Sequence, residues 1–291
     1  MELIPKSSPR FPKLLSEIPD APPLLYVRGN FDFTKPQAML AVVGARKHSA
    51  YGTRVTERLV FDLAKRGAVI VSGLAFGIDR LAHEVTLTAE GQTLSVLPGG
   101  LDDAGIAPRT HLALAHAITE HGALISEWAP GTEITPAHFP VRNRLIAGLC
   151  LGTLIIEAEE ASGSLITASL ATDYNRDVFA IPGPIFSSTS DGPNRLLQRG
   201  AKAILMAEDI FSEYAAFFEK VAGEKQAASN AEAFLTTEEE RLVNCLGSEP
   251  MHIDTIIKIS GLETGQVQSL LTLLELKGVA KNIGSMHYTR Q

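Results

Sequence analysis

The chain has 291 residues, of which 45% are hydrophobic and 20% charged, and a formal net charge of −7. This length favours one large domain plus a smaller one, and the composition is that of a globular protein rather than a disordered one. No stretch approaches the roughly 18 apolar residues of a membrane helix, and the N-terminus lacks a signal-peptide pattern, so we expect a cytoplasmic protein without a membrane partner. The acidic balance argues against nucleic-acid binding by the surface as a whole, but a local cationic cleft could still attract an anion.

Residues 1–37 are rich in proline, which excludes long helices and predicts an extended N-terminal lead-in with one short strand. From there to residue 218, short apolar runs alternate with amphipathic segments, as in a parallel sheet covered by helices. The predicted strands are Leu24–Val27, Leu40–Val43, Val69–Ser72, Leu94–Leu97, Ala123–Ser126, Leu154–Glu157, Val178–Ile181 and Ala203–Met206. The predicted helices are Arg54–Arg66, Ile78–Glu90, Arg109–His121, Asn143–Leu151 and Leu165–Arg176. Residues 38–218 are therefore expected to form an open α/β domain.

Residues 219–233 lack apolar periodicity and are predicted to be a linker. A small domain is expected over residues 234–291, with helices at Glu239–Leu246, Ile253–Ser260 and Thr264–Lys277 and a hairpin after them. Three helices followed by a hairpin predict a winged helix.

Glycine-rich segments follow several predicted strands. They are Gly44-Ala45-Arg46, Gly73-Leu74-Ala75-Phe76-Gly77, Pro98-Gly99-Gly100 and Ser162-Gly163-Ser164-Leu165. Ligands of open parallel sheets bind at the carboxyl ends of the strands, where glycine lets backbone N–H groups approach an anion. Glycine also simply closes turns between strands and helices, but four such loops on one edge predict a phosphate-facing rim.

Two common nucleotide motifs are missing. The next glycine after Gly44 is Gly52, so no G-x-G-x-x-G pattern is present, and no Gly-Lys-Ser or Gly-Lys-Thr occurs for a Walker A loop.

His111, His116 and His121 recur every five residues, which does not keep them on one helical face, so we expect no metal. No other cofactor is expected.

A second cluster combines an aromatic ring with cations and an amide: Phe139, Arg142, Asn143 and Arg144 stand at a predicted helix start. Arginine grips phosphates through paired N–H donors, and phenylalanine offers a stacking face to an unpaired base. A basic first turn beside a core phenylalanine is the alternative. Because arginine in a first turn opposes the helix dipole, we favour the binding interpretation.

The motifs resemble those of the DNA-processing protein DprA, or Smf, family. The resemblance runs in order through residues 24–210, from Ala41-Val42-Val43-Gly44-Ala45-Arg46 and Ser72-Gly73-Leu74-Ala75-Phe76-Gly77-Ile78-Asp79 to Phe139-Pro140-Val141-Arg142-Asn143-Arg144, Glu157-Ala158 and Ser162-Gly163-Ser164-Leu165-Ile166-Thr167. It implies an extended Rossmann-like open parallel sheet with helices on both faces, and an appended winged helix. It also implies a homodimer without catalytic turnover that binds and protects incoming single-stranded DNA and loads a RecA-type recombinase onto it in natural transformation.

Carried over by position, the resemblance gives Arg46 a phosphate contact and places Phe139 near the strand. It assigns Arg142 and Arg144 to a basic wall, and Ser162, Gly163, Ser164 and Thr167 to the start of the adjacent helix. It puts the dimer interface around residues 196–218. Many members of the family carry a helical N-terminal domain ahead of the core, whereas only about three dozen residues precede the core here.

Two other functions are open. Pro98-Gly99-Gly100 is similar to a motif of nucleoside-monophosphate phosphoribohydrolases, which would make the protein an enzyme. Their pattern continues with threonine and glutamate, whereas Leu101-Asp102-Asp103-Ala104 follows here, so the carboxylate needed at the ribose is missing. The rim could instead bind a free nucleotide without turnover.

Overall fold

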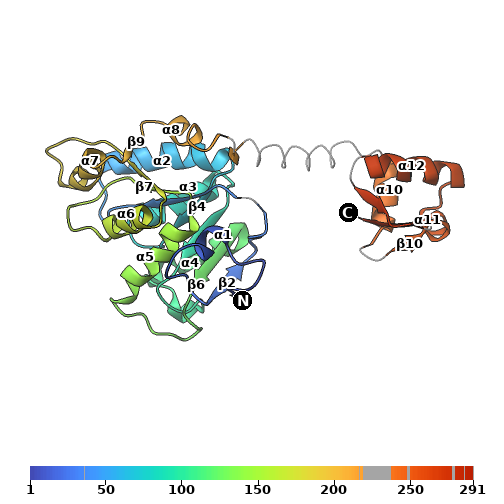
Figure 1. The fold of residues 1–291 in the computed structure, drawn as a ribbon, viewed down its shortest axis with the longest axis horizontal. Helices are drawn as coiled ribbons and strands as arrows, with labels where there is room; N and C mark the ends of the chain where they lie inside the picture. Colours follow the sequence, from blue (N-terminus) through green and yellow to red (C-terminus); the bar gives the residue numbers. More distant parts are fainter. Residues whose placement is uncertain are drawn as a thin grey trace. The chain divides into compact units, whose positions relative to one another are not determined.

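The computed structural model describes residues 1–35, 37–215, 217–218, 237–247, 250–276, 279–284 and 286–290. The chain divides into two compact units, Met1–Val221 and Ala222–Gln291 (Figure 1). We call the first the core unit. The predicted linker at residues 219–233 lies outside the described residues.

The core unit is built on one nine-stranded sheet in the order β1-β2-β6-β5-β4-β3-β7-β8-β9. Strands β3 to β9 are parallel, while β1 and β2 join one edge in antiparallel pairing. The strands are β1 Glu2–Pro5, β2 Leu24–Gly29, β3 Met39–Val43, β4 Val69–Ser72, β5 Thr93–Val96, β6 Gly122–Ser126, β7 Gly152–Ile155, β8 Asp177–Ala180 and β9 Lys202–Ala203.

Helices cover both faces of the sheet, and Figure 1 shows α2 and α6 on opposite sides. The helices are α1 Lys13–Ser16, α2 Ala50–Lys65, α3 Ile78–Thr88, α4 Leu112–His121, α5 His138–Leu149, α6 Gly163–Asp173, α7 Asp191–Gln198 and α8 Glu208–Phe211. Alternate residues of β3 enter opposite cores: Ala41 and Val43 pack with α5 and α6, and Leu40 and Val42 pack with α2 and α3. Burial on both faces explains why the parallel strands are continuous apolar runs.

These observations confirm the predicted extended Rossmann-like fold and correct the N-terminal segment. Residues 1–37 were expected to precede the core as an extended lead-in with one short strand. That strand is β2, but it belongs to the core's sheet together with β1, which was not predicted, and Leu15 of α1 is fully buried in the core. Prolines are compatible with this because β1 is an edge strand. The short helix α7 was not predicted.

Helices α2, α5 and α6 begin earlier than expected. Ser49 caps α2, and its Oγ accepts the N–H groups of Tyr51 and Gly52 at 3.1 and 3.2 Å. Helix α5 begins at His138, so Phe139 and Pro140 lie in its first turn, where proline is tolerated.

The C-terminal unit contains α10 Thr237–Cys245, β10 Met251–His252, α11 Ile253–Ser260, α12 Thr264–Leu276, β11 Ala280–Asn282 and β12 His287–Arg290. Its strands form a sheet in the order β10-β12-β11, and its helices bury an apolar core that includes Leu242, Ile256 and Leu271. The predicted winged helix is confirmed.

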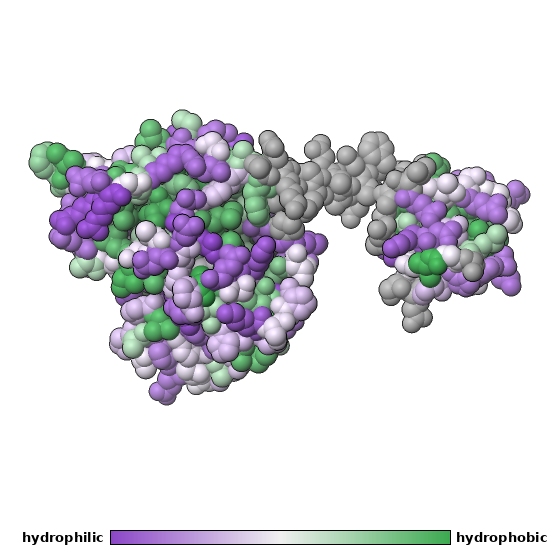
Figure 2. Space-filling model, viewed as in Figure 1, coloured by the Kyte–Doolittle hydropathy of each residue, from purple (hydrophilic) through white to green (hydrophobic). Residues whose placement is uncertain are grey.

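In the view of Figure 2, apolar residues on the core unit form separate patches among hydrophilic ones, as on most globular domains. In the described part of the chain, no helix has the length and apolar character needed to span a bilayer.

Candidate nucleic-acid interface

A pocket of about 420 Å³ opens between the segments that follow β3 and β7. In the sheet, β4 lies on one side of β3 and β7 on the other, so the direction of the connections reverses here. Ligands of open parallel sheets bind at such a switch point. We call this cavity the switch-point pocket. It is lined by Val43, Gly44, Ala45, Arg46, Lys47, Ala75, Asp79, Phe139, Pro140, Arg142, Asn143, Ile146, Glu159, Ala161, Ser162, Gly163, Ser164, Ile166 and Thr167.

The pocket therefore brings together all the predicted site residues except Gly73 and Arg144. They come from segments that are far apart in the sequence: the loop after β3, the first turns of α5 and the start of α6. The segment Pro98–Gly100 does not line the pocket, so the predicted rim of four glycine loops is formed only in part.

Arg46 and Phe139 form one contact surface on the pocket wall. Arg46 is exposed, and its guanidinium carbon lies 5.6 Å from the centroid of the Phe139 ring. Lys47 is exposed beside it. An aromatic ring next to exposed cations can stack a base while a phosphate pairs with the cations.

Glu157 fixes the segment that carries these two cations. Its backbone carbonyl accepts the N–H of Ala45 at 2.7 Å, and its carboxylate accepts the N–H and the Oγ–H of Ser49 at 2.8 and 2.6 Å. Thr189 Oγ1 donates to the same carboxylate at 3.0 Å. Both ends of the segment Ala45–Ser49 are thus held by one residue that is itself 2% exposed.

The first turn of α6 supplies a second feature suited to an anion. Ser162 caps the helix by accepting the N–H of Ser164 at 3.4 Å, and a Cβ at Gly163 would have no atom within 4 Å. This turn is therefore open to the pocket, and a helix N-terminus favours negative charge. Asn143 Nδ2 donates to the carbonyl of Gly163 at 3.2 Å and so ties α5 to this turn.

Arg142 is not the free phosphate-binding cation that was expected. Its side chain is buried, with the residue 3% exposed, and its guanidinium donates to the carbonyls of Gly73, at 2.8 Å, and Val96. Burial lowers the pKa of Arg142 to about 10, so it stays protonated at neutral pH. A Cβ at Gly73 would lie 2.5 Å from this guanidinium, so glycine here admits the arginine rather than a ligand.

Asp79 is a site residue to which the sequence analysis gave no role. The residue is 6% exposed, and its carboxylate accepts the N–H of Gly73 at 3.1 Å. Burial raises the pKa of this carboxyl, while the charge of Arg142 and the backbone N–H groups act in the opposite direction. The N–H of Gly73, assigned to a phosphate in the sequence analysis, thus serves a carboxylate of the protein. An aspartate in the first turn of α3, directly after the glycine-rich segment Gly73–Gly77, was the available signal.

Arg144 lies away from the pocket. It pairs with Glu127, and its Nε lies 3.7 Å from Asp20 Oδ2. Helical geometry explains this, since five residues at about 100° each turn Arg144 roughly 140° away from Phe139. The expected wall of Arg142 and Arg144 is therefore not formed, and both lie in the second turn of α5 rather than its first.

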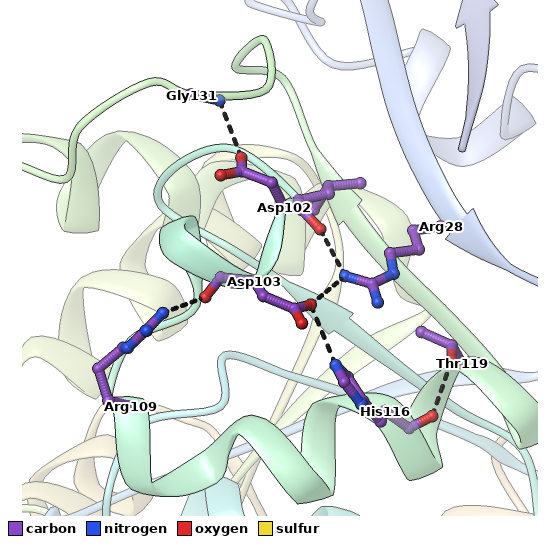
Figure 3. A network of polar contacts seen from close by, with 8 residues as sticks. Arg28, Asp102, Asp103, Arg109, His116, Thr119 and Gly131 are labelled. Atoms are coloured by element: carbon purple, nitrogen blue, oxygen red, sulfur yellow. Dashed lines mark hydrogen bonds and ion pairs between the residues drawn. The ribbon is translucent and has the colours of Figure 1, made fainter.

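The carboxylates that follow Gly99 and Gly100 stabilise surface loops (Figure 3). Asp102 Oδ1 accepts the N–H of Gly131 at 2.8 Å. Asp103 Oδ1 lies 2.7 Å from Arg28 Nη1 and 3.0 Å from His116 Nε2. The hydrogen bond with Arg28 lowers the pKa of Asp103 the most, and the one with His116 lowers it further. These contacts lie outside the switch-point pocket, which explains why this loop does not extend the rim.

His83 beneath the site makes stability depend on pH. It is fully buried, its Nδ1 lies 2.6 Å from Thr93 Oγ1, and burial, with smaller effects of Arg142 and His111, lowers its pKa to about 3. The unfolded chain binds a proton near pH 6.5, while the native state does not until about pH 3, so stability falls as pH drops through this range. The slope for one proton is about 1.4 kcal/mol per pH unit.

We expect His83→Gln to remove this slope. Between pH 6.5 and 5, the wild type should lose about 1.6 kcal/mol more free energy of unfolding than the variant, measured by urea titration. Parallel losses in the two proteins would contradict the assignment of a neutral, buried His83.

Comparison with protein families matches residues 2–215 to DNA recombination-mediator protein A and residues 226–282 to the DprA winged helix domain. The chain is 43% identical over 210 residues to DNA processing protein DprA of Bacillus subtilis, covering 72% of this chain and 70% of the relative. It is 37% identical over 279 residues to protein Smf of Escherichia coli, covering 95% and 74%.

Solved structures give the same relationship. DNA processing protein A from Streptococcus pneumoniae superposes with a TM-score of 0.68 at 41% identity, covering 73% of this chain and 74% of that one. DNA processing protein A from Helicobacter pylori, whose structure describes a single-stranded DNA binding mode, gives a TM-score of 0.63 at 32% identity, with 71% and 93% covered.

Proposed function

Because the chain belongs to the DNA recombination-mediator protein A family, we propose that its switch-point pocket binds single-stranded DNA in a recombination-mediator role. The observation that carries this proposal is the contact of Arg46 with Phe139 at a topological switch point, in a pocket that the open first turn of α6 also lines. Stacking combined with backbone cations holds single strands without requiring a sequence. The Helicobacter pylori relative, described as binding single-stranded DNA, supports this.

The finer proposal is that the protein protects incoming DNA in the cytoplasm and loads a RecA-type recombinase onto it during natural transformation, without catalytic turnover of its own. We propose that it acts as a homodimer through the region around residues 196–218. Within that region Ile204, Ile210 and Phe211 belong to the core, whereas Leu205 and Met206 are 69% and 50% exposed. These two exposed residues offer apolar contacts to a second copy.

Binding of a fluorescein-labelled oligothymidylate, followed by anisotropy, tests the ligand. We expect binding that weakens with salt and is competed by unlabelled single strands but not by equal concentrations of duplex DNA or AMP. If AMP competes but unlabelled single strands do not, a free nucleotide is the ligand. Release of adenine from AMP, detected by chromatography, would support the hydrolase. No binding of the single strand would contradict the proposal.

The recombinase step has a separate measurement. The single-strand-dependent ATPase activity of a RecA-type recombinase should start sooner when this protein is present, because mediator-bound strands are delivered for filament nucleation. An unchanged or longer lag, with single-strand binding intact, would remove the loading role and leave the DNA-binding role standing.

A further inference from the structure

A second pocket, of about 490 Å³, adjoins the switch-point pocket on the other side of Arg46 and Lys47. Both residues line both pockets. The second pocket is otherwise lined by His48, Phe76, Gly77, Arg80, Leu81 and Glu84, and we call it the Phe76 pocket. Arg46 and Lys47 thus lie between two aromatic residues, Phe139 on one side and Phe76 on the other.

Phe76 is presented to solvent although it is a large apolar residue. It is 50% exposed, and its ring meets that of the buried His111 at a steep angle with centroids 4.9 Å apart. The exposed half of the residue is available to a ligand in the pocket that Phe76 lines. An exposed aromatic beside cations is the arrangement that Phe139 and Arg46 show in the first pocket.

The backbone fixes Phe76 relative to Arg46. Gly77 has φ of +82°, and a Cβ there would lie 2.2 Å from the carbonyl oxygen of Ala45 and 2.6 Å from that of Arg46. The N–H of Ile78 donates to the same Ala45 carbonyl at 3.2 Å. Only glycine allows the two loops to approach this closely, so the second ring is held at a set position beside the shared cations.

The charges in the Phe76 pocket favour an anion. Its lining has three cations, Arg46, Lys47 and Arg80, and one carboxylate, Glu84. Glu84 accepts a hydrogen bond from Arg80 Nε at 2.8 Å. Both side chains of this pair are substantially exposed, so the pair is weak and Arg80 can turn to a phosphate.

We propose that the bound single strand continues from the switch-point pocket across Arg46 and Lys47 into the Phe76 pocket. There a base stacks on Phe76, and Arg80 binds the adjoining phosphate. This inference rests on the proposed single-stranded DNA binding, and it adds a second base-stacking position that sets the length of strand the protein holds.

Anisotropy with oligothymidylates of about 4 and about 16 nucleotides tests the second position, because these lengths bracket typical single-strand site sizes. Phe76→Leu keeps apolar volume but removes the ring, and should weaken binding of the long strand about 5- to 100-fold while leaving the short strand unchanged. Phe76→Tyr should bind both strands like the wild type. Arg80→Ala should flatten the salt dependence of the long strand only.

Phe186→Leu is the matched control, since Phe186 is 97% exposed and lines neither pocket. Thermal unfolding of each variant separates lost binding from lost folding. If Phe76→Leu binds the long strand as tightly as Phe186→Leu does, or loses the short strand equally, the inference fails while the proposed function stands. If the wild type binds neither strand, both fail.

Discussion

Replacing Arg142 with leucine is expected to lower the free energy of unfolding by about 3–5 kcal/mol, because the buried charge network around it loses its cation. The carbonyls of Gly73 and Val96 would each lose a charged donor, and Asp79 would lose the nearby positive charge that favours its ionised form. Urea unfolding at pH 7 measures this loss.

Arg195→Leu provides the comparison for this prediction. Arg195 is half-exposed and pairs with Glu160 on the surface, so its replacement should cost at most about 1 kcal/mol. Adding Asp79→Asn to Arg142→Leu should recover part of the loss, since the uncompensated carboxylate is then gone. A loss for Arg142→Leu no larger than for Arg195→Leu would show that Arg142 does not organise the strand ends.

The second large effect concerns DNA. Arg46→Ala should weaken oligothymidylate binding about 10- to 100-fold, because a charged hydrogen bond to phosphate contributes about 1.5–3 kcal/mol. The slope of log affinity against log salt should flatten by about 0.7 for one lost phosphate contact on a single strand. Phe139→Ala should weaken binding by a similar factor without changing the slope, since a stacking contact releases no counterion.

Arg66→Ala is the control for Arg46→Ala. Arg66 is also stacked on a phenylalanine, with its guanidinium carbon 3.9 Å from the Phe211 ring centroid, but it lines neither pocket. Since Arg46 and Phe139 are in contact, their double variant should lose less than the sum of the two single losses. Equal affinities for Arg46→Ala and Arg66→Ala would remove Arg46 from the site.

The sequence was sufficient for the parallel sheet because strands buried on both faces leave continuous apolar runs, as in Leu40–Val43 and Val69–Ser72. It was insufficient for β1, because Glu2–Pro5 is a short edge strand with only Ile4 buried. Pairing with β2 rather than local pattern makes that segment a strand. Helix α7 was also missed, because its eight residues are too few to show a clear helical period in the sequence.

For the candidate site, the motifs located segments that line the switch-point pocket, but not the orientation of each side chain. Arg46 and Phe139 meet in the pocket as expected, whereas Arg142 turns inward to backbone carbonyls and Arg144 turns to Glu127. The sequence alone does not distinguish an arginine that faces a pocket from one that donates to backbone carbonyls. For Arg142 and Arg144, the direction of each side chain depends on helix phase, which the start of α5 at His138 sets.

The central claim, that a single strand lies in the switch-point pocket, is tested most directly by photocrosslinking. An oligothymidylate carrying 4-thiothymidine is irradiated with the full chain, and the crosslinked peptides are identified by mass spectrometry. The account predicts crosslinks to peptides containing Phe139 and the start of α6, abolished by excess unlabelled single strand. Crosslinks confined to the winged helix, or to the surface around Asp103, would contradict it.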